Sequence, residues 1–314
     1  MAAAQRTFTC FGGACTVLVE GAGAADAVIA ARDQLLEWHD VFSRFKPESE
    51  LSRLNADPRE RVPASPSMAR FAAAAVAAAE ATGGLVDPTL LEEIEAAGYR
   101  SDRLRGTLAL PMALTLTPGR AAAGPHPDER WRAVDADLGA GLITRPPGVK
   151  LDGGGIVKGL CADWLAESLG GHESFAVDCE GDLRVGGAGG VERAIQVASP
   201  FDGAILHAFA LRDGGVATCD IAKRSWLGEG TRPAHHLLDA ATGQPAYTGV
   251  VQATALASTA LEGEALAKAA VLSGPDGAAV WLRHGGVLVF DDGSHAVVPV
   301  TALPSTRAGG AGTS

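Results

Sequence analysis

The chain has 314 residues, of which 47% are hydrophobic and 20% charged, a composition typical of a soluble globular protein. Its formal net charge of −11 argues against nucleic acid or an anionic membrane as a partner, because both attract basic patches. No apolar run reaches the roughly 18 residues needed to span a bilayer, and the N-terminal sequence MAAAQRTFTC lacks the apolar core of a signal peptide.

The cysteines indicate a reducing compartment. They are odd in number and contain no CxxC pair, the set being Cys10, Cys15, Cys161, Cys179 and Cys219. Such a set favours buried free thiols over a disulfide framework. We therefore expect a cytoplasmic protein.

The first predicted elements are a strand over residues 7–20, interrupted by Gly12 and Gly13, and a helix that begins at about Ala24. The helix is predicted because apolar residues recur at intervals of three and four, which places them on one buried face. These residues are Val28, Ala31, Leu35, Trp38 and Phe42. The helix ends in the polar segment before Asn55.

A second helix begins at Ser65 and Pro66, a good N-cap followed by proline at the first helical position. Its alanine-rich run ends at Gly83 and Gly84. Residues 100–126 give only a weak signal, and 118–129 predict a loop or an insertion.

The second half of the chain is rich in short strands. A helix runs from the glycine turn at 153–155 to about Leu169, and another from about Leu261 to Leu272. Strands are predicted in SFAVDC, ERAIQVAS, ILHAFAL, GVATC and VVQATALAS, with a closing hairpin formed by GGVLVFDD and HAVVPV.

Helices and strands are mixed without strict βαβ alternation, so the sequence predicts an α+β fold with mixed sheets and packed helices. Neither a repeat nor a clean linker is visible. We therefore expect a single domain over residues 1–304, followed by a disordered tail over residues 305–314.

The stretch LDGGGIVKG, residues 151–159, combines a bare glycine turn with a lysine in the first turn of a helix. It matches neither the P-loop nor the Rossmann glycine pattern. Glycines let a backbone approach a ligand closely, and a helix N-terminus attracts anions. Lys158 therefore favours a bound anion, although a tight turn with a solvated lysine is an equal alternative for the stretch alone.

Three further motifs carry chemistry only in combination. In HHLLDAATGQP, His236 and Asp239 are three residues apart, so a carboxylate could orient a general base, or the pair could lie in a surface turn. Asp87 follows a glycine helix stop in ATGGLVDPTL, which is a common turn. Glu264 and Lys268 are one helical turn apart, and a surface salt bridge is the simplest interpretation.

In their order along the chain these motifs resemble the FAD:protein FMN transferase family (ApbE-type). The resemblance extends from about Phe42 to Gly274. The matching segments are FSRFKPESELSRLN, ATGGLVDPTL, LDGGGIVKG, FAVDCEGDLRVGG, GGVATCD, HHLLDAATGQP and EGEALAKAAVLSG. It implies one α+β unit with two interlocked halves and FAD between them. The implied reaction moves FMN from FAD onto a Ser or Thr hydroxyl of a target flavoprotein and releases AMP.

The resemblance also implies roles for individual residues. Phe45 and Tyr99 would stack on FAD, Leu85, Val86 and Asp87 would line its site, and Asp152, Lys158 and Asp182 would bind or border it. His236 would take the proton from the target hydroxyl, assisted by Asp239 and Lys158. Gly155 and Glu264 would contact Mg²⁺.

The chain departs from the family pattern on the last helix. The family carries an Asp, followed one turn later by Asp or Thr, where this chain has Glu264 and Lys268. We therefore expect the Lys268 ammonium to take the place of the metal and to contact FAD, although Mg²⁺ bound through Glu264 and Gly155 is the alternative. The same change keeps open a second function, that of an FAD-binding carrier or regulator without transferase activity.

Overall fold

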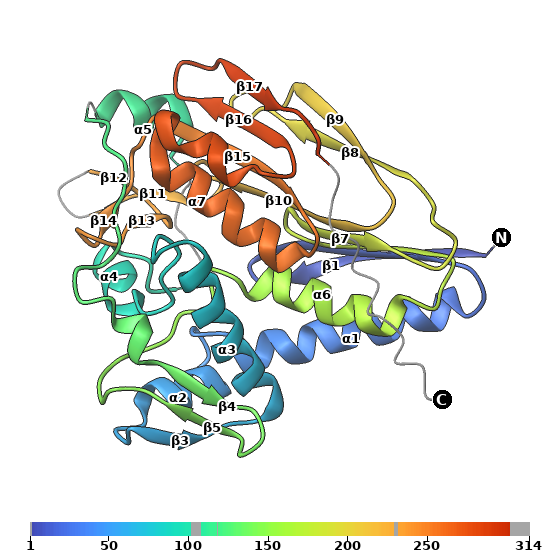
Figure 1. The fold of residues 1–314 in the computed structure, drawn as a ribbon, viewed down its shortest axis with the longest axis horizontal. Helices are drawn as coiled ribbons and strands as arrows, with labels where there is room; N and C mark the ends of the chain where they lie inside the picture. The colour runs from blue at the N-terminus through green and yellow to red at the C-terminus, as the bar shows by residue number, and fades with distance from the viewer. Residues whose placement is uncertain (1, 102–107, 118, 229–231, 302–314) are drawn as a thin grey trace.

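The structure is a computed structural model that describes residues 2–101, 108–117, 119–228 and 232–301. Its centre is an eight-stranded sheet in which every neighbouring pair is antiparallel (Figure 1). In spatial order the strands are β1 (Ala3–Cys10), β2 (Gly13–Glu20), β6 (Ser174–Cys179), β7 (Asp182–Gly186), β10 (Gly214–Asp220), β15 (Val250–Ala257), β16 (Gly286–Phe290) and β17 (His295–Val298).

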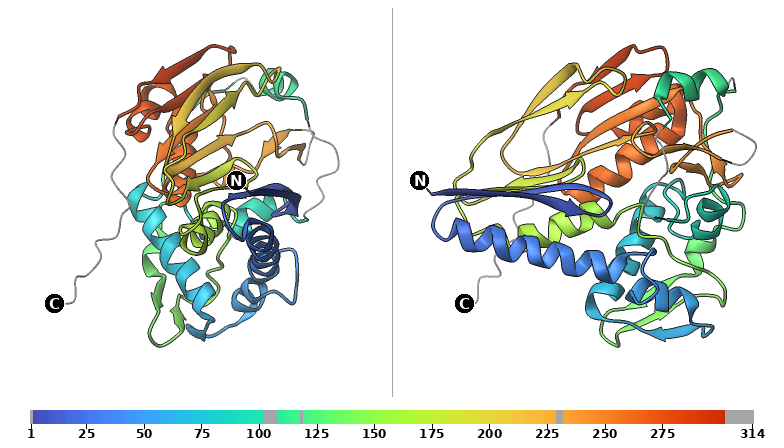
Figure 2. Two further views of the ribbon diagram at one scale, coloured as in Figure 1. Left: turned by 90° about the vertical axis from the view of Figure 1, so that its right-hand side faces the viewer. Right: turned by 180° about the vertical axis from the view of Figure 1, so that it is seen from behind.

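Three long helices cover one face of this sheet (Figures 1 and 2). They are α1 (Ala24–Phe42), α6 (Val157–Leu169) and α7 (Ala260–Ala278). Helix α1 packs against β1 and β2, α6 against β6 and β7, and α7 against β10 and β15. Helices α6 and α7 also pack against each other, so the middle and the C-terminal part of the chain meet at this contact.

The remaining elements, all short except the 16-residue helix α3, lie around the central sheet. The helices are α2 (Glu50–Ala56), α3 (Pro66–Ala81), α4 (Leu91–Ala96), α5 (Leu110–Leu116) and the 3-10 turns η1 (Arg130–Ala133) and η3 (Ala279–Trp281). A three-stranded sheet has the order β3 (Arg61–Pro63), β5 (Leu142–Thr144), β4 (Asp135–Asp137). Three two-stranded ribbons join β8 (Arg193–Ala198) to β9 (Ile205–Leu211), β11 (Ser225–Leu227) to β12 (Pro233–His235), and β13 (Leu238–Asp239) to β14 (Gln244–Pro245).

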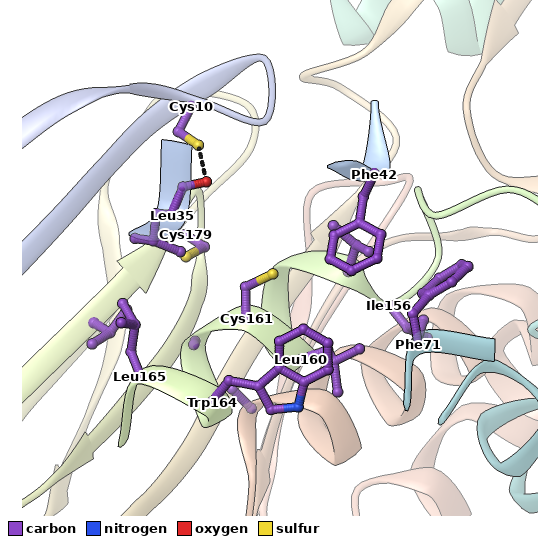
Figure 3. Packing of buried hydrophobic residues seen from close by; sticks show 14 of the residues in the cluster. Cys10, Leu35, Phe42, Phe71, Ile156, Leu160, Cys161, Trp164, Leu165 and Cys179 are labelled. Carbon is purple, nitrogen blue, oxygen red and sulfur yellow. Dashed lines mark hydrogen bonds between the residues drawn. The ribbon is translucent and has the colours of Figure 1, made fainter. Parts of the chain in front are cut away.

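The apolar core has two large parts. One lies between α1, α3, α6 and the β1–β2 hairpin, where Phe42 packs against Phe71 with ring centroids 5.4 Å apart (Figure 3). In the same part, the ring of Trp164 lies 5.1 Å from that of Trp38. The other is built mainly from β10, β15, β16 and α7. All five cysteines are buried and free, which confirms the expected reduced thiols.

The predicted α+β class is confirmed, and the long elements begin and end close to the expected residues. The interrupted strand over residues 7–20 is a hairpin, because Phe11 and Gly12 both adopt positive φ and reverse the chain. Helix α7 continues to Ala278 but is broken at Gly274, whose φ of 70° and ψ of 177° are not helical. The predicted tail over residues 305–314 lies outside the described residues.

Within the described ranges, no helix has the length and hydropathy that crossing a bilayer requires.

Candidate functional site

A cavity of about 510 Å³ opens between the C-terminal end of α1, the β1–β2 turn, the glycine turn before α6 and the segment that contains β12 and β13. Ten of the residues proposed from the sequence line it, namely Phe45, Leu85, Val86, Asp87, Tyr99, Asp152, Gly155, Lys158, His236 and Lys268. A second, smaller cavity of about 30 Å³ shares Lys158, His236 and Lys268 with it and is also lined by Asp182. Residues that are far apart in the sequence therefore meet at one place.

The glycine turn is held against the rest of the cavity wall by the segment after α1. The Asn55 side chain donates to the Leu151 carbonyl and accepts from the Leu151 amide, both at 2.8 Å. The Arg44 guanidinium lies 3.2 Å from the Asp152 carboxylate, and the Asp152 amide donates to the Pro88 carbonyl. These contacts fix the backbone of the turn immediately before the N-terminus of α6, the positive end of the helix dipole, which favours an anion.

Two aromatic rings lie beside Arg44 on the same wall. Its guanidinium carbon is 4.3 Å from the ring centroid of Phe45 and 4.7 Å from that of Tyr99. Tyr99 also packs against Trp226 with centroids 5.5 Å apart, and the Trp226 indole donates to the Ala97 carbonyl. Flat aromatic and guanidinium surfaces of this kind can stack on a planar ring system.

The turn after α3 presents a carboxylate to the cavity. The Thr82 hydroxyl accepts from the Val86 amide, and Oδ1 of Asp87 accepts from both the amide and the hydroxyl of Thr89. The other oxygen, Oδ2, is buried and has no hydrogen-bond partner among the described residues. Since buried polar atoms are almost always paired, Asp87 is suited to accept a hydrogen bond from a ligand.

A cluster of four charged side chains lies where α6 and α7 meet. Lys158 contacts the Asp182 carboxylate and lies 3.7 Å from Oε1 of Glu264, and Lys268 donates to the same Glu264 oxygen at 2.7 Å. The second Glu264 oxygen accepts from the Gly159 amide at 2.8 Å. The sequence suggested a surface salt bridge between Glu264 and Lys268, but Glu264 is 1% exposed and Lys268 6%.

Mutual attraction keeps most of this cluster charged. Burial alone would raise the pKa of Glu264, but the ammonium groups of Lys268 and Lys158 outweigh burial and lower that pKa. Burial would lower the pKa of Lys158, but Asp182 and Glu264 raise it above its usual value. Burial and the Glu264 charge raise the pKa of Asp182 to about 7. Lys158 therefore offers positive charge to a ligand in the cavity.

His236 borders both cavities, and its Nδ1 is buried without a hydrogen-bond partner among the described residues. Burial, followed by the charges of Arg224, His235 and the two lysines, lowers the pKa of His236 well below its usual value. Its imidazole is therefore neutral near pH 7, and a neutral imidazole has a lone pair that can accept a proton.

The structure does not bring Asp239 to His236, although their spacing made that contact possible. The Asp239 carboxylate accepts from the amides of Gly124 and Ala241 and from the Thr242 hydroxyl at 2.8, 3.1 and 2.8 Å. Both of its oxygens thus fix the turn between β13 and β14. The role of Asp239 is to hold that turn, and it does not line either cavity.

Besides Arg44, two further cations of the cavity wall, Lys223 and Arg224, were missed from the sequence. Arg224 donates to the Phe11 carbonyl at 3.0 Å and contacts the Glu180 carboxylate, and Lys223 lies next to it on the cavity wall. No local pattern marks these residues, because they reach the site only through the loop between β10 and β11. Lys223 and Arg224 stand side by side in IAKRSW, and this pair of cations was the one available signal.

The donor set does not fit the metal that the sequence resemblance implies. Among the described residues, no group of three or more His, Cys, Asp or Glu side chains is placed to hold a metal ion. Glu264, the one carboxylate expected as a ligand, already binds an ammonium and a backbone amide. Gly155 lines the cavity and could offer only its backbone carbonyl.

Known proteins are similar to this chain over most of its length. Residues 11–290 match the model of the ApbE family. A FAD:protein FMN transferase of Treponema pallidum (strain Nichols) is 28% identical, over 89% of this chain and 81% of the relative. A FAD:protein FMN transferase of Klebsiella pneumoniae (strain 342) is 25% identical, over 85% and 77%.

Solved structures show the same fold. The ApbE protein of Thermotoga maritima superposes with a TM-score of 0.76 at 24% identity, covering 94% of this chain and 97% of the other. The flavinyl transferase ApbE of Pseudomonas stutzeri, in its apo form, gives a TM-score of 0.73 at 20% identity and covers 94% of both chains. The family match, extending over nearly all the elements that build the cavity, shows that this chain belongs to the ApbE family.

Proposed function

We propose that this protein is a FAD:protein FMN transferase. The observation that carries the proposal is the gathering of basic side chains on the cavity wall of an acidic chain. Five basic side chains line the cavity (Arg44, Lys158, Lys223, Arg224 and Lys268), against three acidic ones (Asp87, Asp152 and Glu180). Such a wall favours an anionic ligand, and FAD combines an anionic pyrophosphate with two planar ring systems.

The cavity offers a suitable surface for each part of FAD. The volume of about 510 Å³ lies within the roughly 300–1,000 Å³ usual for ligand sites. Phe45 and Tyr99 provide surfaces for stacking, and the glycine turn with Lys158 and Lys268 provides an anion site for the pyrophosphate. Asp87 has a free acceptor for an N–H or hydroxyl donor of the ligand.

In the proposed reaction a Ser or Thr hydroxyl of the target attacks the phosphorus atom on the FMN side of the pyrophosphate. The new bond joins that phosphorus to the hydroxyl oxygen, and the bond from phosphorus to the bridging oxygen breaks, so that AMP leaves. His236 takes the hydroxyl proton. Lys158 and Lys268 stabilise the charge that develops on the phosphoryl oxygens.

The lowered basicity of His236 is compatible with this role. Three of the groups that depress its pKa are the cations Arg224, Lys268 and Lys158. A bound pyrophosphate would compensate their charge and so raise the pKa of the imidazole towards its usual value. His236 would then be a better base with FAD present than in the empty site.

The first test separates binding from transfer. Wild-type protein is mixed with FAD and with candidate acceptor domains, and AMP release and the mass gain of the acceptor are measured. His236→Ala should bind FAD with unchanged affinity but lose about 100- to 10,000-fold in AMP release, the usual contribution of a general base. His295→Ala, on the exposed part of β17, is the matched control and should behave as wild type.

A second candidate function is an FAD carrier or regulator without transferase activity, and the Lys268–Glu264 pair is the observation that favours it. FAD binding by wild type without AMP release or labelling of any acceptor would support this candidate. Failure to bind FAD, or tighter binding of riboflavin than of FAD, would contradict both.

A further inference from the structure

We propose that the Lys268 ammonium performs the charge neutralisation for which related proteins carry a metal ligand on this helix, so that the chain binds the FAD pyrophosphate without Mg²⁺. The inference rests on the proposed function for the identity of the ligand. That no metal binds here is inferred separately, from the geometry of the buried charges.

The Lys268 side chain lies between Glu264 and the cavity. Its ammonium donates to Oε1 of Glu264 at 2.7 Å, and its side chain lines both the main and the smaller cavity. Glu264 lines neither of them. A ligand in the cavity therefore meets the ammonium, and the carboxylate lies behind it.

Both oxygens of Glu264 are already engaged, and Glu264 does not line the cavity. Oε2 accepts from the Gly159 amide at 2.8 Å, and Oε1 lies 2.7 Å from the Lys268 nitrogen and 3.7 Å from that of Lys158. For Mg²⁺ to take the place of Lys268, the lysine would have to leave a 1%-exposed carboxylate. Mg²⁺ also demands near-octahedral oxygen coordination, which a neighbouring ammonium opposes by repulsion.

The two lysines have donors left for a ligand. An ammonium carries three N–H donors, and Lys268 uses one on Glu264 while Lys158 contacts Asp182 and lies near Glu264. The carboxylates hold both ammonium groups in fixed positions next to the glycine turn. Lysine binds phosphate well as a point charge, so a pair of fixed lysines can replace one divalent ion opposite a pyrophosphate.

The test measures the affinity for FAD by fluorescence quenching, in EDTA and again in saturating Mg²⁺. For wild type we expect the two dissociation constants to agree within about twofold, because no metal contributes to binding. Lys268→Thr removes the ammonium and frees Glu264. This variant should bind FAD about tenfold more weakly in EDTA, and Mg²⁺ should restore much of the loss.

Lys223→Thr is the matched control. Lys223 lines the same cavity but its side chain is 55% exposed, and its carboxylate neighbour is Asp220 rather than Glu264. Losing this charge should weaken FAD binding about equally in EDTA and in Mg²⁺, so the ratio of the two constants should stay within about twofold. Wild-type affinity that falls about tenfold or more in EDTA would overturn the inference.

A titration with Mn²⁺ in the absence of flavin separates this inference from the proposed function. Wild type should bind no Mn²⁺ in the micromolar range, whereas Lys268→Thr should bind more tightly than wild type. Tight Mn²⁺ binding by wild type overturns the inference even if FAD binds well. Failure of wild type to bind FAD in either buffer counts against the proposed function, and the Mn²⁺ result then still decides whether the donor set holds a metal. Should Lys268→Thr fail to fold, the wild-type measurements alone give the answer.

Discussion

At the scale of single residues, several side chains of the site leave a polar group free to meet a ligand. Asp87 uses Oδ1 within its own turn and leaves Oδ2 free, and Lys268 uses one donor on Glu264. His236 leaves Nδ1 without a partner. Binding residues that are fixed on one side lose little conformational entropy when a ligand arrives, which favours affinity.

The residue types of the site could be predicted from the sequence better than their partners. The glycine turn, Lys158 and His236 were recognised because their order along the chain resembled a known pattern. The partner of Asp239 could not be predicted, since spacing alone permits either a contact with His236 or the turn that the structure shows. The i,i+4 pattern alone did not reveal that the Glu264–Lys268 pair is buried, because the same pattern occurs on exposed helices; only the resemblance placed Lys268 in the site.

His235 gives a prediction for the dependence of stability on pH. It is fully buried on β12, its ring lies edge-on to Tyr247 at 4.7 Å, and burial lowers its pKa from 6.5 to about 3. The unfolded chain therefore binds a proton that the folded chain cannot bind between pH 6.5 and about 3. The free energy of unfolding is therefore not reduced by His235 above pH 6.5. It falls by about 1.4 kcal/mol per pH unit as the pH falls from 6.5 towards 3.

In the wild type the Leu237 amide donates to Nδ1 of His235. The variant His235→Asn keeps an acceptor near that amide. The variant should be less stable at pH 7, but its free energy of unfolding should fall less steeply between pH 7 and 5. Urea denaturation at several pH values measures how steeply the free energy of unfolding changes with pH in the wild type and in the variant. The exposed His295→Asn supplies the control for the loss of a histidine, and equal slopes for wild type and His235→Asn would refute the assignment.

At the scale of elements, the crossing of α6 and α7 positions the charged cluster. Asp163 on α6 accepts from the amides of Ala260 and Leu261 at 2.8 and 2.9 Å, so one helix supplies the cap of the other. The Thr259 hydroxyl accepts from the Glu262 amide and completes the cap of α7. Because free N–H groups at a helix start need acceptors, these bonds fix where α7 begins and hence where Glu264 and Lys268 lie.

Long elements were predictable and short ones were not. Helices α1, α3 and α6 have clear periodicity or terminal signals, such as the Ser65 side chain that accepts from the Met68 amide. The short helices α2, α4 and α5 and the two-residue strands β13 and β14 have too few residues for a periodic pattern. They form because neighbouring parts of the fold supply their partners.

Gly159→Ala tests the helix crossing. A Cβ at this position would lie 2.6 Å from the Ala260 carbonyl oxygen and 2.7 Å from the Leu261 nitrogen, both backbone atoms. Although alanine gains about 1 kcal/mol over glycine in a helix, we expect a net loss of about 1–3 kcal/mol because the two helices must move apart. Denaturant titration gives the change in the free energy of unfolding.

The matched control is Gly171→Ala, just after the end of the same helix, where an added Cβ meets nothing within 4 Å. It should change stability by no more than about 0.5 kcal/mol. Equal stability of Gly159→Ala and Gly171→Ala would show that α6 can shift freely against α7. The charged cluster would then need another explanation for its fixed geometry.

At the scale of the whole molecule, the central sheet joins parts of the chain from both ends. The N-terminal hairpin pairs with β6, and the C-terminal hairpin pairs with β15, so strands from residue 3 to residue 298 share one hydrogen-bonded array. The cavity is likewise lined from both core regions, by Val86 and Val157 of one and Leu237 and Leu272 of the other. A ligand in the cavity therefore contacts both parts of the core at once.

This arrangement predicts that the chain unfolds as one unit and that FAD stabilises all of it. A single calorimetric transition is expected, with the calorimetric and van't Hoff enthalpies equal, although chains of this length often unfold in steps. FAD at a hundred times its dissociation constant should add about 2.7 kcal/mol to the free energy of unfolding. The temperature of the whole transition should rise accordingly. Two separate transitions, or a shift by FAD of only part of the signal, would show that the two core regions are independent domains. A single shifted transition would instead support one domain organised around the cavity, because a ligand that contacts both core regions stabilises only states in which both are folded.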